Sequence, residues 1–244
     1  VSRAPLEKLE LAGVVIDPSN GRMVVPVVDA CGRLRTYVAR KTDQSPEERE
    51  YVDASGETVV VRNPKYLNAK RSRPGDTFFV GARGDGAIDH PAERRPIAVV
   101  EGALDVIPHI DSKLVLYAAA LGGVKGPQVE RLVGAARRGR SVVLVPDVDA
   151  LAKAEIAKNQ ILAAVPGSRV GVVNLSLPGG SPDPDEIPTD LLDALVLRAV
   201  ADGVAALADM PLDKYGYSSH VGSTGRSPTV TGRLAMDAKL SVRV

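Results

Sequence analysis

The section of the sequence between residues 97 and 175 constrains the fold most, because strand-like and helix-like segments alternate along it. Short β-branched, apolar runs predict strands at 97–100, 114–118, 142–145 and 169–175. Longer stretches between them predict helices at 103–110, 127–137 and 151–165. Apolar residues make up 44% of the chain and aromatic residues only 3%. This composition and alternation predict an α/β fold with an open, mostly parallel sheet flanked by helices.

The residues before this section predict a smaller, mixed α+β subdomain with a basic character. A helix is expected at 6–11, strands at 23–28 and 34–39, a polar loop at 42–50 and a hairpin at 51–61. Lys, Arg, Pro and Gly are then frequent up to residue 95. We therefore divide the chain into a basic subdomain at 1–93 and the sheet domain at 94–187. A C-terminal helix at 188–210 and a tail or linker at 211–244 complete the division.

The helix after the sheet domain is expected within residues 189–207, with Thr189 or Asp190 as its N-cap. The Gly-, Ser- and Thr-rich stretch after residue 211 has no helix signal before about residue 233.

Charge and cysteine content exclude several classes of protein. The formal net charge of +1 excludes a uniformly basic coat for nucleic acid, although it allows a local basic patch. Cys31 is the only cysteine, so no disulfide framework or cysteine-based zinc site can form within the chain. The single cysteine fits a reducing compartment, so we expect a cytoplasmic protein. The sequence shows no signal peptide and no apolar run long enough for a membrane span. Since it begins at Val1, we interpret the sequence as a fragment or processed piece of a longer protein.

Carboxylates follow three of the predicted strands. Glu101-Gly102 directly follows the first strand, and Asp105 would lie in the first turn of the next helix. The third strand leads into a D-x-D pair, Asp147 and Asp149, which on extended backbone would point the same way. The loop after the fourth strand contains Asp183-Pro184-Asp185-Glu186.

Ligands of open α/β sheets gather at the carboxyl ends of the strands, so these carboxylates should meet at one edge. They would repel one another there, and hard divalent cations such as Mg²⁺ or Mn²⁺ would relieve the repulsion. A single D-x-D or D-P-D is more often an ordinary turn. The ordered set of three motifs is what indicates a cation site.

This ordered set resembles the Toprim domain, which DnaG-type primases share with topoisomerases and some nucleases. Leu121-Gly122-Gly123 falls where primases have a glycine-bearing turn, and the D-P-D-E loop is similar to the acidic loop of DnaG-type primases. Upstream, residues 21–29 with Gly32-Arg33 are similar to a primase hairpin that Arg40 would close. Residues 64–68 match its P-K-Y-L-N motif. The resemblance covers roughly residues 10–187.

The resemblance implies a Toprim-type sheet and a DNA primase activity, in which short RNA primers are synthesised on a single-stranded DNA template by Mg²⁺-dependent nucleotidyl transfer. It implies ribonucleoside triphosphates as substrates, a replicative helicase as a candidate partner, no membrane, and a place at the nucleoid or replication fork. Glu101, Asp105, Asp147 and Asp149 would be catalytic. Two Mg²⁺ (or Mn²⁺) ions would be held by Glu101, Asp147, Asp149, Asp183 and Asp185.

The resemblance also implies a basic wall that binds nucleotide or DNA. Arg40 and Lys65 are its most direct candidates, and Tyr66 could stack on a base or lie half-buried in the core. The full set is Arg22, Arg33, Arg35, Arg40, Lys65, Tyr66, Asn68, Lys70, Arg71 and Arg73. For most of the Lys and Arg residues, simple solvation at the surface is the competing interpretation.

Several features depart from the family pattern. Val148 stands where primases usually have glycine in the D-x-D motif, and Ala150-Leu151-Ala152 replaces the usual continuation. Residues 42–62 resemble an insertion, and neither a zinc-binding domain nor a P-loop ATPase motif is present. These departures favour a divergent phage, plasmid or mobile-element primase, or an excised core.

Two other functions remain open. One is a Toprim nuclease or topoisomerase-like enzyme acting on phosphodiesters, and the other is a non-catalytic DNA-binding module of replication. His90, His109 and His220 lack the spacing of metal ligands, and we expect His109 to be structural.

Overall fold

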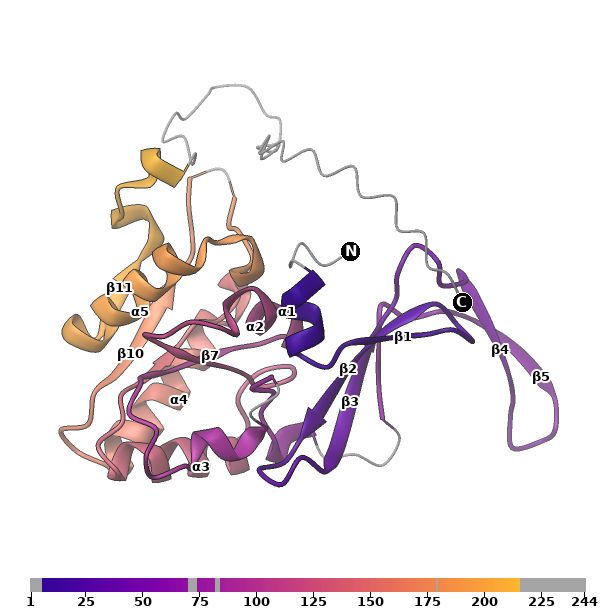
Figure 1. The fold of residues 1–244 in the computed structure, drawn as a ribbon, viewed down its shortest axis with the longest axis horizontal. Coiled ribbons are helices and arrows are strands. Elements are labelled where there is room, and N and C mark those ends of the chain that lie inside the picture. The colour runs from indigo at the N-terminus through magenta and orange to yellow at the C-terminus, as the bar shows by residue number, and fades with distance from the viewer. Residues whose placement is uncertain (1–5, 70–73, 82–83, 179, 216–244) are drawn as a thin grey trace.

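The computed structural model describes residues 6–69, 74–81, 84–178 and 180–215 (Figure 1). Lys70, Arg71 and Arg73 of the expected basic wall lie outside the described residues, as does most of the expected tail, 216–244. Within the described part of the chain, no helix is both long enough and apolar enough to cross a membrane.

The first part of the chain forms an antiparallel sheet preceded by the short helix α1 (Leu6–Leu11). Its strands are β1 (Val15–Asp17), β2 (Arg22–Val28), β3 (Leu34–Arg40) and β6 (Tyr66–Asn68), in the order β1-β2-β3-β6. The sequence predicted β2 and β3 but not the two three-residue edge strands, which are too short to show a pattern.

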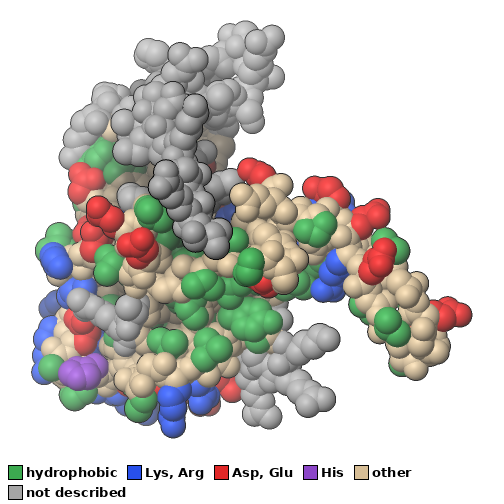
Figure 2. All heavy atoms as spheres, turned by 45° about the vertical axis from the view of Figure 1, so that its right-hand side comes forward, with side chains coloured by type: hydrophobic (Ala, Val, Ile, Leu, Met, Phe, Trp, Pro, Cys, Tyr) green, Lys and Arg blue, Asp and Glu red, His purple; other side chains and the backbone are tan. Residues whose placement is uncertain are grey.

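Strands β4 (Glu48–Val52) and β5 (Thr58–Arg62) form a separate two-stranded hairpin, which stands out from the rest of the molecule (Figures 1 and 2). Because β4 begins at Glu48, the loop expected at 42–50 is three residues too long. The hairpin coincides with most of the segment that resembles an insertion, and Figure 2 shows acidic side chains along it.

The second sheet has five strands in the order β11-β10-β9-β7-β8, and every neighbouring pair is parallel. They are β7 (Ile97–Val100), β8 (Leu116–Ala119), β9 (Val142–Leu144), β10 (Val170–Asn174) and β11 (Val204–Ala206). The α/β class, the parallel sheet and the smaller mixed part before it are thus confirmed, and the four expected strands lie close to their predicted positions.

Helices cover both faces of this sheet (Figure 1). On one face lie α3 (Gly126–Arg137) and α4 (Leu151–Ala164), which contribute Leu132 and Ile161 to the core. The other face packs against α2 (Ala103–Val106), the 3₁₀ helix η3 (Ile107–His109) and α5 (Thr189–Asp202). Successive strand residues alternate between the two cores, as the two-residue period of a strand requires.

The expected C-terminal helix at 188–210 is wrong in its second half. Gly203 adopts a left-handed conformation (φ 78°) that ends α5 at Asp202, and the next three residues form β11 at the edge of the sheet. The N-cap prediction is also wrong. Pro188 occupies that position, while the hydroxyl of Thr189 is bonded to His109 and Pro108.

The two parts of the chain share one core. Met23, Val25 and Val27 of β2 are buried in the same cluster as Leu104 and Ile107. Phe79, which follows the antiparallel sheet, exchanges two backbone hydrogen bonds with Ala119 of β8, of 3.0 and 2.8 Å. The antiparallel sheet is therefore packed directly against the parallel sheet and is not joined to it by a linker alone.

Gly171 allows α5 to approach the sheet closely, since a Cβ atom there would lie 2.4 Å from the Ala199 carbonyl oxygen. We expect Gly171→Ala to lower the free energy of unfolding by about 1–3 kcal/mol, because the helix must shift. Gly134→Ala in α3 is the control, since its Cβ would meet nothing closer than 3.5 Å. This control should be stabilised by about 0.5–1 kcal/mol through helix propensity. Urea denaturation measures both, and equal losses would contradict the expectation.

Candidate active site

Three neighbouring parallel strands deliver the predicted carboxylates to one edge of the sheet. Glu101 directly follows β7, and Asp147 lies three residues after β9. Asp183 precedes the 3₁₀ helix η5 (Pro184–Glu186), in the loop after β10. Since β10, β9 and β7 are adjacent and parallel, their carboxyl ends lie side by side. The predicted gathering of these acidic segments at one edge is thus observed.

The spacing of the E-G-x-x-D motif is explained by a contact between its glycine and its aspartate. Helix α2 begins after Gly102, as predicted, and the Asp105 carboxylate accepts a 2.7 Å hydrogen bond from the Gly102 N–H. A Cβ atom on residue 102 would lie 2.8 Å from the same carboxylate oxygen, so glycine allows this contact. Asp105 therefore caps the helix as half of a capping box.

The pKa of Asp105 is raised to about 7, mainly by burial of the carboxyl group. The hydrogen bond from Gly102 acts against this rise, while the charges of Asp185, Asp147 and Asp183 contribute to it.

The D-x-D motif is not extended, contrary to the sequence prediction. Val148–Ala150 form a 3₁₀ turn (η4) in which the Ala150 N–H donates to the Asp147 carbonyl oxygen at 2.9 Å. Asp147 is consequently half-buried, while Val148 and Asp149 are exposed. Both carboxylates still act on the cluster, since Asp149 raises the pKa of Asp147 and of Glu101.

The carboxylates of the three strand ends are electrostatically coupled. Burial raises the pKa of Glu101, and the charges of Asp147 and Asp149 raise it further. Burial likewise raises the pKa of Asp147, followed by the charges of Asp183 and Asp149. Each carboxylate thus opposes the ionisation of its neighbours, and a bound cation would relieve that repulsion.

The donor chemistry fits a hard divalent cation, because carboxylate oxygens are the ligands that Mg²⁺ and Mn²⁺ prefer. Among the residues described, no three His, Cys, Asp or Glu side chains surround a common point where an ion could sit. Mg²⁺ usually keeps several of its waters and needs only one or two carboxylates, so the arrangement is compatible with such an ion.

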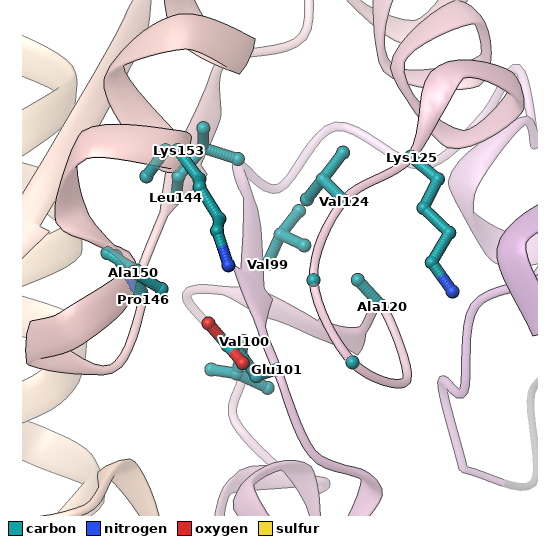
Figure 3. A pocket seen from close by; sticks show the side chains of 13 residues that line it. Val99, Val100, Glu101, Ala120, Val124, Lys125, Leu144, Pro146, Ala150 and Lys153 are labelled. Carbon is teal, nitrogen blue, oxygen red and sulfur yellow. The ribbon is translucent and has the colours of Figure 1, made fainter.

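A cavity of about 140 Å³ lies beside Glu101, between the ends of β7, β8 and β9 (Figure 3). The turn at Gly122 and Gly123 lines it, and both glycines have positive φ angles (101° and 88°). Sequence reasoning gave no role to Lys153, whose ammonium group points toward Glu101 in Figure 3 and lowers the Glu101 pKa. Its position could have indicated a role, because Lys153 follows the D-x-D motif by one helical turn.

A basic and aromatic group faces the acidic edge from the first part of the chain. Arg40 and Tyr66 are partners in the β3–β6 register. The Arg40 guanidinium carbon lies 5.7 Å from the centroid of the Tyr66 ring, and the Lys65 ammonium lies 5.5 Å from it. Burial raises the pKa of Tyr66, and charges on Asp105, Asp185 and Asp183 contribute to the rise. The ring thus lies within the field of the acidic cluster.

The other residues expected in the basic wall differ in their placement. Arg22 is buried, with 2% of its surface exposed, and donates hydrogen bonds to the Ala39 carbonyl, the Asn63 side chain and the Pro64 carbonyl. These bonds give Arg22 a structural role in place of the expected binding role. They support the segment that carries Lys65. Arg33 is exposed and forms an ion pair with Asp29, and Arg35 is exposed on β3. Asn68 ends β6.

Comparison with solved structures identifies the fold. A DnaG catalytic core is 22% identical and aligns over 79% of this chain and 58% of its own, with a TM-score of 0.50. A DnaG primase catalytic domain bound to ssDNA is 21% identical over 78% of this chain and 59% of its own, also with a TM-score of 0.50. The Aquifex aeolicus primase, with its zinc-binding and RNA polymerase domains, is 24% identical over 79% and 44%, with a TM-score of 0.49.

The chain therefore has the fold of DnaG-type primase catalytic cores, as the resemblance in its sequence implied. It spans about half of the length of the primase structures that it matches. No protein family model and no curated protein matches the sequence.

The raised pKa of Asp105 predicts a specific pH dependence of stability. The folded state holds this proton up to about pH 7, whereas the unfolded chain releases it near 3.8, so the contribution of Asp105 to stability falls as the pH rises between these values. Asparagine has no charge to bury and can still accept the Gly102 N–H. In EDTA, the stability of Asp105→Asn relative to wild type should increase by about 2–3 kcal/mol from pH 5 to pH 8.

Urea denaturation at the two pH values measures this difference. Asp209→Asn, at an exposed carboxylate, is the matched control and should follow the wild type. The same pH dependence in Asp105→Asn as in the wild type would contradict the prediction.

Proposed function

We propose that this chain is the catalytic core of a DNA primase, a nucleotidyltransferase that joins ribonucleotides on single-stranded DNA. One observation carries the proposal: coupled carboxylates from three adjacent strand ends face Arg40, Lys65 and Tyr66 within a primase-type fold. An acidic edge suits cations, and a basic, aromatic surface opposite suits a nucleic acid strand or nucleotide. Together they form the two sides that a polyphosphate substrate requires.

The acidic side would hold two Mg²⁺ (or Mn²⁺) ions through Glu101, Asp147, Asp149, Asp183 and Asp185, with Asp105 in support. Such ions bind triphosphate oxygens, activate an attacking hydroxyl and stabilise the leaving pyrophosphate. A bound cation would relieve the repulsion among the three carboxylates whose pKa values are raised, Glu101, Asp105 and Asp147. Lys153, beside Glu101, supplies a positive charge for a substrate phosphate.

The basic side would bind the template and the incoming ribonucleoside triphosphate. Tyr66 is 44% exposed, so its ring can stack on a base while Arg40 and Lys65 contact phosphates. Arg33, Arg35, Asn68, Lys70, Arg71 and Arg73 would extend this surface. The comparison with the primase domain bound to ssDNA supports a single-stranded template. A replicative helicase at the replication fork is the corresponding partner.

Replacing Asp147 tests the catalytic proposal. Asp147→Asn removes one charge from the centre of the coupled cluster and should lower primer synthesis by at least about 100-fold, by analogy with the loss of one key electrostatic group. The assay supplies single-stranded template, ribonucleotides and Mg²⁺, and measures labelled primers. Asp209→Asn, beyond the end of β11, serves as the matched control and should keep full activity.

Normal primer yield from Asp147→Asn would end the proposal. Nicks in the template, without primers, would favour the Toprim nuclease alternative. Binding of Mg²⁺ without turnover by the wild type would favour a non-catalytic module.

The basic side has a separate test in its salt dependence. Lys65→Gln should reduce the slope of log affinity for single-stranded DNA against log salt by about 0.7, the value for one phosphate contact. Tyr66→Leu should weaken binding by about 1–3 kcal/mol without changing this slope, because stacking releases no counterions. Arg137→Gln, which replaces an exposed cation near the end of α3, is the control. Fluorescence anisotropy measures all three, and an unchanged slope for Lys65→Gln would refute the contact.

A further inference from the structure

We propose that His109 is a positioning residue, which holds the acidic loop (residues 183–186) beside Asp105 and thereby sets the affinity of the carboxylates for a divalent cation. This inference rests on the proposed function in that it assigns the cation to the same cluster. His109 belongs neither to the D-P-D-E motif nor to a strand end. It lies in η3, a separate segment of the chain.

The first contact is to the middle of the acidic loop. His109 is buried, with 1% of its surface exposed, and its Nε2 atom lies 2.9 Å from the Pro184 carbonyl oxygen. A carbonyl oxygen can only accept a hydrogen bond, so Nε2 carries the proton and donates it. Pro184 stands between Asp183 and Asp185, so this bond fixes the backbone from which both carboxylates project.

The second contact is to the residue at which the next helix begins. The Nδ1 atom of His109 lies 2.9 Å from the hydroxyl oxygen of Thr189, the first residue of α5. The same hydroxyl lies 3.2 Å from the Pro108 carbonyl oxygen. One imidazole ring therefore contacts both Pro184 and Thr189, which enclose the C-terminal half of the acidic loop.

The ring itself is held in place. Its centroid lies 4.8 Å from that of the Tyr117 ring, and the two planes are inclined at 35°. The ring of Tyr117 is itself buried, with 3% of its surface exposed, and its hydroxyl donates a 2.8 Å hydrogen bond to Asp193 of α5. A side chain supported on both ring nitrogens and one face can transmit its position to the groups that it contacts.

Backbone hydrogen bonds inside the acidic loop give it its turn. Within it, the Glu186 N–H donates to the Asp183 carbonyl at 2.9 Å, and the Ile187 N–H donates to the Pro184 carbonyl at 3.2 Å. These bonds shape η5, and the contact with His109 joins its backbone to η3. The charges of Asp183 and Asp185 act on Asp105, and Coulomb energies fall with distance. A small displacement of the loop therefore changes the cluster.

Two substitutions separate the two contacts. His109→Gln places an amide NH₂ near the position of Nε2 and can keep the bond to Pro184. His109→Asn has the same functional group on a shorter chain, near the position of Nδ1, and loses that bond. Tyr117→Phe is the control, because it keeps the ring that packs on His109 and removes only the hydroxyl that bonds to Asp193 in the same core.

Two readouts that do not require catalysis decide the question. Mn²⁺ titration followed by electron paramagnetic resonance gives the dissociation constant, and hydrogen exchange reports on the Glu186 and Ile187 amides. His109→Asn should weaken Mn²⁺ binding about 5- to 10-fold, the effect of one lost hydrogen bond, and should speed exchange at both amides. His109→Gln should stay within about twofold of the wild type, as should Tyr117→Phe in Mn²⁺ binding.

The inference is overturned if His109→Asn binds Mn²⁺ as the wild type does, if Tyr117→Phe weakens binding equally, or if the wild type binds no Mn²⁺. If folding fails in His109→Asn, Thr189→Val removes the Nδ1 partner without altering the ring, and an unchanged exchange rate at Glu186 then overturns the inference. The primer assay distinguishes the two proposals. Loss of Mn²⁺ affinity in His109→Asn, in a wild-type protein that makes no primers, would refute the proposed function alone.

Discussion

The parallel pairing of β9 with β7 and β10 is the constraint on which the candidate site depends. Leu144 of β9 is in register with Val99 on one side and Val172 on the other. This register aligns the ends of three strands, so that residues distant in sequence emerge at one edge. The resulting concentration of negative charge is unfavourable in itself. It is supported by two apolar cores that bury the strands from both faces.

The second constraint is the attachment of the antiparallel sheet to the parallel one. The backbone exchange between Phe79 and Ala119 and the shared core of β2 and η3 place Tyr66 within the field of the acidic cluster. Arg131 of α3 adds ion pairs to Asp85 and Asp89, at 2.9 and 2.6 Å. The opposite charges of the site are thus built on separate sheets that cannot move independently without breaking these contacts.

Much of this arrangement was predictable from the sequence, and the failures have physical causes. The parallel strands were recognised because both of their faces are buried, which leaves continuous apolar runs such as 97–100. The end of α5 was missed because apolar residues continue beyond Gly203, although a glycine in the left-handed conformation commonly ends a helix. Thr189 has the sequence of an N-cap but bonds to His109, a tertiary contact. The sequence predicted that Arg22 lies at the surface. Its guanidinium is buried instead, because it donates hydrogen bonds to the Ala39 and Pro64 carbonyls. The charge on Lys153 lies near Glu101 only after α4 has packed on the sheet.

The order of the strands has a consequence for biosynthesis. The central strand β9 is made after both strands on one side of it and before both strands on the other. The edge strand β11 follows a further helix. The sheet therefore cannot be completed until residue 206 has emerged from the ribosome. Parallel pairing of this kind is non-local and forms slowly. A nascent chain would consequently expose the apolar edges of β7 and β9 while its acidic residues were still apart, which makes this interval the one in which chaperones have most to protect.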